Sequence, residues 1–343
     1  MLKLGVVTRG GVRHPRTLFG RRRHISFLLL RELAADPSSD PDAYDRLAGH
    51  ACMPNGVWKL TRHGRLRVLD AAVMDILAAR VAPQSELVVC DLAASTGATS
   101  VDFYRTLQGR YRPRFIASDL YRDLVAVRGV GGRTAVIFDG SGQAVQYVCG
   151  PFVLPGASDE SAAYPVNRAL KATLRGRLLP AARTALRGVR LRELGPFEAA
   201  EASGYEIVKL PMLTKDTLAV IAEGSGFSFQ EWNILEPLPE RANIVRAVNI
   251  LTPEHFADDI RARAITNCVE AVEPGGLFIV GSNPTPEAAS IKASIYGVER
   301  DHLVRLASLN DGSEIDGLVA RTHRVLESTA IPSKGVARHA HRG

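Results

Sequence analysis

The stretch Glu86-Leu-Val-Val-Cys-Asp91-Leu-Ala-Ala-Ser-Thr-Gly97 decides the fold of this 343-residue chain. Residues 86–91 are an apolar run that ends in an acid, which predicts a buried strand, and small residues follow up to Gly97. An amphipathic helical pattern then reaches Leu107, and a second apolar run ends at Asp119. This β-loop-α-β order predicts a parallel sheet with helices on its faces.

The same alternation of apolar runs and helical patterns surrounds this core. Helical patterns are expected at 25–35, 64–81 and 253–272, and strands at 227–234, 243–251 and 276–282. Two β-rich runs near the end, 290–298 and 302–309, are joined by a short polar turn and predict an antiparallel pair that closes the sheet.

The α/β rhythm is interrupted from about 133 to 212. Two β-rich runs surround Asp139-Gly-Ser-Gly142 and predict a hairpin, and an arginine-rich helical pattern follows over 167–194, with a kink or break expected at Pro180. We therefore expect an N-terminal helical segment (1–63), a catalytic domain (64–330) carrying a hairpin-plus-helix insert, and a basic disordered tail (331–343).

The composition is that of a globular protein, with 46% hydrophobic residues and a net charge of +7. The four cysteines lie far apart without a CxxC pair, so we expect no metal site and no disulfide framework. No export signal and no membrane-spanning apolar run is visible in the sequence, which predicts a cytoplasmic protein.

The first loop has the residues that a nucleotide-like ligand requires. Such ligands sit at the carboxyl ends of the strands of an open α/β sheet, and Ala93, Ser95 and Gly97 would let a ligand approach closely. The helix that starts after Gly97 offers free N–H groups to a carboxylate. Asp119 could accept hydrogen bonds from both ribose hydroxyls.

Several short motifs resemble the chemoreceptor glutamate methyltransferases, and they occur in that family's order between about residues 86 and 282. They are Ser95-Thr96-Gly97, Trp232-Asn233-Ile234-Leu235 before Glu236-Pro-Leu-Pro, Arg246 in the next strand, and the late EPGGLFIVGS. The resemblance implies a Rossmann-like, seven-stranded class I methyltransferase sheet that binds S-adenosyl-L-methionine.

The resemblance also implies the cofactor contacts. Small residues of the first loop would line the methionine part, Asp119 would hold the ribose, and Asn233 with Ile234 would flank the adenine. The predicted cofactor-binding residues are Asp91, Ala93, Ala94, Ser95, Thr96, Gly97, Asp119, Leu120, Asn233, Ile234 and Arg246.

The chain departs from the family on the substrate side. Ala247 stands where the family has an asparagine, and Leu251-Thr252 replace an aromatic pair. We therefore predict methyl transfer to an oxygen or nitrogen acceptor of unknown identity, with a non-catalytic, cofactor-binding regulatory protein as the alternative. A nicotinamide dehydrogenase fits less well, because the loop reads ASTG rather than GxGxxG.

No catalytic residue is assigned from the sequence. His255 could reach an acceptor, but a solvated turn residue is the simpler interpretation, and packing is the simpler one for Tyr296. Asp139 reads as a turn former. In-line transfer from a sulfonium depends mainly on alignment, so an unmistakable catalytic residue is not required.

The insert helix leaves the partner question open. Its apolar residues recur every three or four positions, and Glu193 is the only acidic residue among its many basic ones. We favour a lid whose apolar face packs on the sheet domain, and the alternative is peripheral contact of 167–194 with an anionic membrane surface. Nucleic-acid binding through Arg21-Arg22-Arg23 is the weaker option, since aromatic stacking residues are sparse there.

Overall fold

The computed structural model describes residues 5–9, 12, 24–36, 42–49, 53, 59, 61–129, 131–156, 165–285, 288 and 290–327. The chain forms two compact units. The Rossmann unit contains residues 63–94, 99–120 and 224–343, and the insert unit contains 1–62, 95–98 and 121–223. The expected disordered tail and the Arg21-Arg22-Arg23 run lie outside the described residues.

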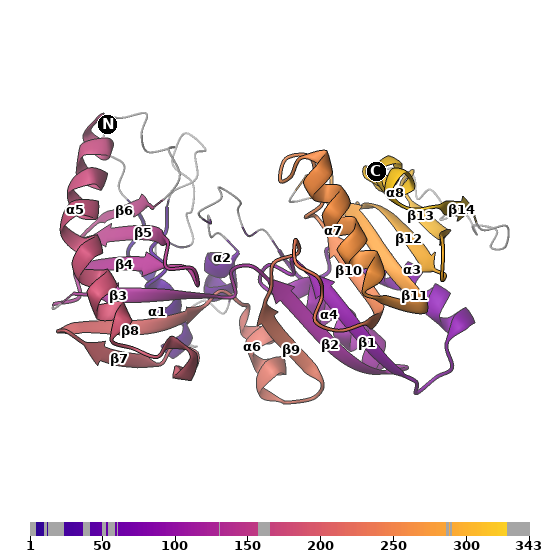
Figure 1. The fold of residues 1–343 in the computed structure, drawn as a ribbon. Coiled ribbons are helices and arrows are strands. Elements are labelled where there is room, and N and C mark those ends of the chain that lie inside the picture. Colours follow the sequence, from indigo (N-terminus) through magenta and orange to yellow (C-terminus); the bar gives the residue numbers. More distant parts are fainter. Residues whose placement is uncertain are drawn as a thin grey trace, which may run out of the picture. The chain divides into compact units, whose positions relative to one another are not determined.

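The Rossmann unit is built on an eight-stranded sheet in the order β14-β13-β12-β11-β10-β1-β2-β9 (Figure 1). The five strands from β11 to β9 are mutually parallel, and β12 is antiparallel to both of its neighbours. The strands are β1 (Glu86–Leu92), β2 (Arg112–Asp119), β9 (Phe227–Glu231), β10 (Ala242–Val248), β11 (Val272–Ser282), β12 (Lys292–Val298), β13 (Leu303–Leu309) and β14 (Val325–Glu327).

Helices cover both faces of this sheet, which is why its central strands are apolar on both sides. One face packs on α7 (Asp258–Glu270) and α8 (Asp316–Thr322), whose buried residues join those of β10 and β11 in one core. The aromatic ring of Phe115 on β2 contacts Phe103 and Tyr104 of α4 (Ala98–Gln108). The helix α3 (Arg67–Arg80) precedes β1.

The Rossmann-like prediction is confirmed. The predicted antiparallel pair is β12 and β13, paired from Ala293–Leu309 to Val298–Leu303. The sheet has one strand more than the expected seven, because the short β14 adds parallel to β13. Sequence periodicity gave no signal for β14, whose three residues include two that are exposed.

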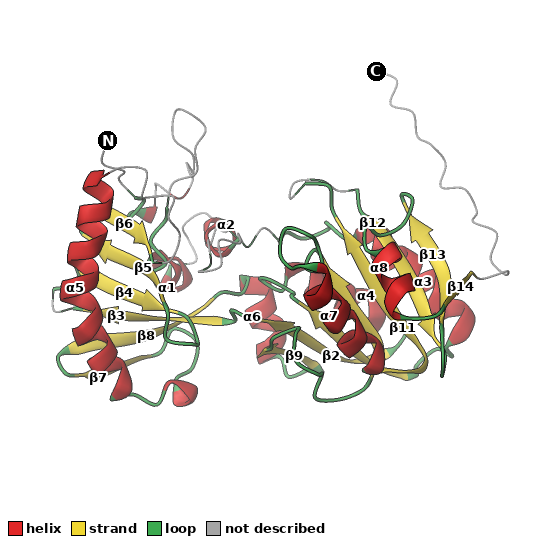
Figure 2. Ribbon diagram, turned by 45° about the horizontal axis from the view of Figure 1, so that its top comes forward, coloured by secondary structure: helices red, strands yellow, loops and turns green. Residues whose placement is uncertain are grey.

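The insert unit contains a second, six-stranded sheet in the order β6-β5-β4-β3-β8-β7 (Figure 2). All of its pairings are antiparallel. The elements are α1 (Leu29–Ala35), α2 (Ala43–Ala48), β3 (Asp123–Arg128), β4 (Thr134–Phe138), β5 (Ala144–Cys149), β6 (Phe152–Pro155), α5 (Pro165–Arg187), β7 (Ala199–Ala202), β8 (Tyr205–Pro211) and α6 (Lys215–Ala222).

The alternating side chains of β3 show that both faces of this sheet are covered. Leu124 and Ala126 belong to the core that contains α1 and α2, whereas Val125 and Val127 belong to the core under α5. The described residues of the N-terminal segment therefore pack in the insert unit, together with residues that follow them by about a hundred positions.

The insert is larger than the predicted hairpin plus helix. The hairpin is present as β4 and β5, and Asp139 forms its turn by accepting hydrogen bonds from the backbone N–H groups of Ser141 (3.0 Å) and Gln143 (2.8 Å). The helix α5 runs through Pro180 without a break and ends at Arg187 rather than near Leu194. None of the helices in the described part of the chain is long and apolar enough to cross a membrane.

Candidate functional site

The carboxyl ends of the parallel strands meet at one edge of the Rossmann sheet. Leu92 of β1 pairs with Ser118 of β2 and with Ala247 of β10, and Asp119 pairs with Glu231 of β9. The chain continues from β1 toward β2 on one side and from β10 toward β11 on the other. Strand order thus reverses between β1 and β10, and ligands of open α/β sheets bind at the carboxyl ends beside such a point.

The loop after β1 has an unusual backbone. Ala93, Ser95 and Gly97 all have positive φ angles, of 55°, 59° and 83°. Residues with a Cβ rarely adopt this region, and such strain is concentrated at functional sites. The alternation that the sequence suggested from small side chains is therefore an alternation of left-handed residues.

Within the insert unit, protein groups brace the carbonyl oxygens of Ser95 and Thr96. Lys59 Nζ donates to the Ser95 oxygen at 2.9 Å, and Thr96 oxygen accepts from the Thr214 N–H at 3.0 Å and from Thr217 Oγ1 at 3.1 Å. A Cβ on Gly97 would lie 2.6 Å from Thr217. The structure accounts for the small residue at Gly97 by this packing, and its role toward a ligand stays a prediction.

The other predicted contacts at this edge lie on β2 and the end of β9. The Ala94 N–H donates to the Ser118 oxygen at 2.8 Å, so the loop after β1 is tied to the strand that ends at Asp119. Asp119 is half-buried, and the next residue, Leu120, is 43% exposed although it is large and apolar. This edge of the sheet therefore offers a ligand a carboxylate and an exposed apolar side chain next to each other.

Asn233 and Ile234 follow β9 at the same edge. The backbone N–H of Trp232 donates to the backbone carbonyl oxygen of Asp119 at 3.1 Å, which aligns the two chain segments. Asn233 Oδ1 accepts from the Leu235 N–H at 3.0 Å and shapes the turn, and Ile234 is buried. The indole Nε1 of Trp232 is buried without a hydrogen-bond partner in the described part of the chain. Sequence reasoning used Trp232 only as a motif residue and did not include this donor.

Arg246 and Asp91 bind each other. The Arg246 guanidinium is 1% exposed and donates to Asp91 through Nε (2.8 Å) and Nη2 (2.6 Å), to Asp70 Oδ1 through Nη1 (2.8 Å), and to the Thr99 oxygen (3.2 Å). Ser100 Oγ also donates to Asp91. These donors and acceptors fasten β10, β1, α3 and α4 together, and a cofactor contact by either residue stays a prediction.

The charges in this cluster are unequal. Burial raises the pKa of Asp70 to about 7 against the attraction of Arg246, and the charge of Asp91 raises it further. Burial alone lowers the pKa of Arg246, but the two carboxylates raise it, so the guanidinium stays charged. Two buried acids therefore share one cation here.

The weaker candidates have structural partners. Tyr296 is buried, and its hydroxyl donates to Asp316 Oδ1 at 2.8 Å. His255 lies in a turn, with its N–H on the Thr252 oxygen. No group of three or more His, Cys, Asp or Glu side chains in the described ranges could hold a metal ion.

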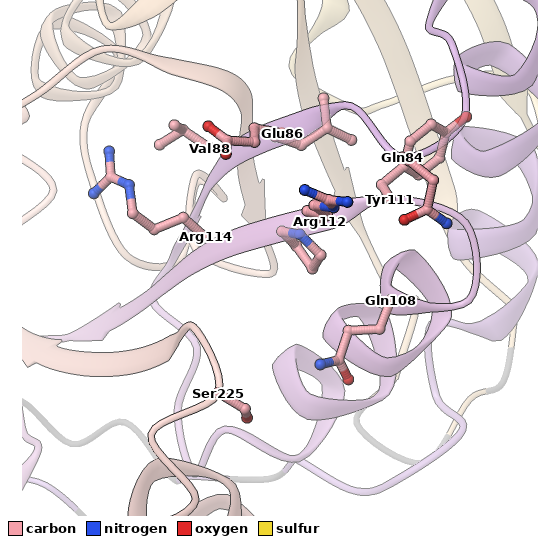
Figure 3. A pocket seen from close by; sticks show the side chains of 10 residues that line it. Gln84, Glu86, Val88, Gln108, Tyr111, Arg112, Arg114 and Ser225 are labelled. Carbon is pink, nitrogen blue, oxygen red and sulfur yellow. The ribbon is translucent and has the colours of Figure 1, made fainter.

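Two cavities of the Rossmann unit lie near the strands. A cavity of about 540 Å³ opens at the amino ends of β1 and β2, the edge opposite to the loop, where Gln84, Glu86 and Arg112 line it together with Arg114 (Figure 3). A second cavity of about 10 Å³ lies at the carboxyl ends of β10 and β11, between Leu251 and the 313–315 segment. The second has room for about one water molecule.

Comparisons with known proteins add the following. No protein-family model and no curated protein matches the chain. Among solved structures, N-methyltransferase NodS from Bradyrhizobium japonicum WM9 with S-adenosyl-L-homocysteine is 11% identical, over 74% of this chain and 71% of that chain, with a TM-score of 0.27.

Two further structures match at a similar level. CalS10, an amino pentose methyltransferase from Micromonospora echinaspora with bound SAM, is 12% identical over 70% and 68% of the two chains, with a TM-score of 0.28. An S-adenosylmethionine-dependent methyltransferase from Clostridium acetobutylicum ATCC 824 is 8% identical over 74% and 78%, with a TM-score of 0.29. Because these scores are low, the fold assignment rests on the strand order, and the finer resemblance to chemoreceptor methyltransferases stays a prediction.

Proposed function

We propose that the chain binds S-adenosyl-L-methionine at the carboxyl edge of the Rossmann sheet and transfers its methyl group to an oxygen or nitrogen acceptor. The observation that carries the proposal is the loop after β1, whose left-handed Ala93, Ser95 and Gly97 follow the strand beside the point where strand order reverses. Asp119, at the end of the neighbouring strand, supplies the carboxylate for the ribose.

The residues at this edge fit such a cofactor. The buried, unpartnered Nε1 of Trp232 is a donor that a ligand acceptor could satisfy, and it directly precedes Asn233 and Ile234, the residues proposed to flank the adenine. When bound, the cofactor supplies a methyl group activated by a sulfonium. The chain then has to hold the acceptor in line and exclude water, which needs no general base for an ionised acceptor.

Binding of S-adenosylhomocysteine, measured by calorimetry, tests the proposal. Asp119→Ala should weaken binding by about 1–3 kcal/mol, the cost of unpaired hydroxyls in a partly buried site. The matched control is Glu86→Ala, which removes an acid from the opposite edge of the same sheet and should leave the affinity unchanged. No binding by the unaltered protein, or equal affinity of the Asp119 variant, would refute the proposed site.

One observation favours a non-catalytic cofactor-binding protein as the second candidate. Ala247 and Leu251-Thr252 stand where the family that the chain resembles has an asparagine and an aromatic pair, so residues on the substrate side of that family's site are missing. Methyl-donor consumption across pools of acceptors separates the two candidates. Binding without turnover on any acceptor would favour the regulatory protein.

A further inference from the structure

The net positive charge of the chain lies in the insert unit. The insert unit has 24 Lys and Arg residues against 15 Asp and Glu, a net charge of +9, whereas the Rossmann unit has 19 against 21 and a net charge of −2. The alkaline isoelectric point near 9.4 therefore originates in the insert unit. Such an asymmetry indicates an anionic partner for that unit.

The helix α5 displays much of this charge to solvent. Its 23 residues include no Asp or Glu, and Arg175, Arg177, Arg183 and Arg187 are exposed. None of these four makes an ion pair within the described residues, and the nearby Glu193 pairs with Arg190 instead. Four unneutralised guanidinium groups on one helix repel one another, so a polyanion that binds them would relieve this repulsion.

The opposite side of α5 is buried, and this favours a nucleic acid over a membrane surface as the anionic partner. Leu174, Leu179 and Ala182 pack on the six-stranded sheet in the core that contains Val136 and Phe138. Figures 1 and 2 both show α5 lying across the strands of that sheet. The lid hypothesis expected this face on the sheet of the catalytic domain, and it lies instead on the insert's own sheet.

An interfacial membrane helix inserts its apolar face among lipids, and binding strength grows with the apolar area buried. The apolar face of α5 is already buried against the six-stranded sheet. Among the described residues of the helix, Val166 is the only large hydrophobic one that is exposed. Binding to a nucleic acid needs no such anchor, because contacts to phosphates alone supply sequence-independent affinity.

We propose that the exposed arginines of α5 bind the phosphate backbone of a nucleic acid without reading its sequence. Arg175 and Arg187 lie 12 residues apart, which is about 18 Å along the helix axis, enough for contacts with several phosphates in succession. The planar guanidinium donates two parallel hydrogen bonds to a phosphate, which suits arginine better than lysine for these contacts. This inference does not depend on methyl transfer.

Fluorescence anisotropy with the full chain tests it, using a labelled 24-base-pair DNA duplex and a labelled 24-nucleotide RNA of mixed sequence. The variant Arg175→Gln/Arg177→Gln/Arg183→Gln/Arg187→Gln keeps the side-chain length and helix propensity. We expect it to bind at least roughly tenfold more weakly at 50 mM salt, with a shallower dependence of log K on log salt, since each lost phosphate contact reduces the slope by about 0.9 on a duplex.

The control variant removes the same charge from the Rossmann unit, at four exposed arginines. These are Arg67, Arg112, Arg263 and Arg300. This variant should bind like the unaltered protein. Equal losses in both variants would mean a non-specific effect of net charge and would overturn the assignment to α5.

Vesicles provide the other decisive outcome. Flotation with vesicles of 70% phosphatidylcholine and 30% phosphatidylserine should recover little protein. Binding to these vesicles, without binding to either nucleic acid, would refute the proposal and identify α5 as a membrane-contacting surface.

Discussion

Replacing Arg246 by methionine tests the argument that a buried cation holds the Rossmann unit together. The substitution keeps much of the side-chain volume but removes four hydrogen bonds, to Asp91, Asp70 and the Thr99 oxygen. It also removes a guanidinium that lies 4.7 Å from the ring centroid of Phe103. Two buried carboxylates would lose their cation, and breaking such a buried pair costs about 3–5 kcal/mol.

The measurement is urea unfolding at pH 8, followed by tryptophan fluorescence in a Trp58→Phe background, so that Trp232 of the Rossmann unit is the reporter. Because protonation removes the unpaired charges, the loss of unfolding free energy should be smaller at pH 5 than at pH 8. Adding Asp70→Asn to the methionine variant should restore part of the loss. A loss below about 1 kcal/mol at pH 8, or one that grows at low pH, would refute the reasoning.

Three further results are expected. Because burial raises the pKa of Asp70 to about 7, the folded chain retains its proton between about pH 4 and 7, so the unfolding free energy relative to Asp70→Asn should fall as the pH rises through this window; a pH-independent difference in urea midpoints would contradict this. Gly97→Ala should cost about 2 kcal/mol or more in thermal unfolding, since Gly97 has a φ of 83° and its new Cβ would meet Thr217. Thr217→Ala should cost about 1 kcal/mol alone, through the hydrogen bond to Thr96, yet recover part of the loss in the Gly97 variant; no recovery would place the whole cost in the backbone.

The Rossmann sheet could be predicted because each of its parallel strands carries its own local signal. The runs 86–91 and 114–119 are apolar and end in acids, and the helix between them is amphipathic. Of the second sheet, only the hairpin of β4 and β5 was predicted from the sequence. The strand Ala199–Ala202 contains three alanines and one glutamate, which have low strand propensity, and it forms only because β8 pairs beside it.

For the candidate site, the sequence singled out individual residues but not the groups that they contact. A lone arginine in the apolar run 243–251 signals a buried cation that needs acids, and Asp70, in the predicted helix 64–81, was the available signal. The contact between Arg246 and Asp70 depends on how α3 packs on the sheet, and no local sequence pattern predicts this packing. The contact of Gly97 with Thr217 likewise joins positions 120 residues apart in sequence and could not be anticipated.

The pairing of β2 with β9 has a consequence for biosynthesis. Adjacent strands of this sheet end at Asp119 and begin at Phe227, and every segment of the insert unit has left the ribosome before the second of them emerges. Translation adds about 5–20 residues per second, so the roughly one hundred residues between Asp119 and Phe227 take on the order of 5–20 s to synthesise. Until then β1 and β2 have exposed edges, and the nascent chain is open to chaperones and to mispairing in that interval.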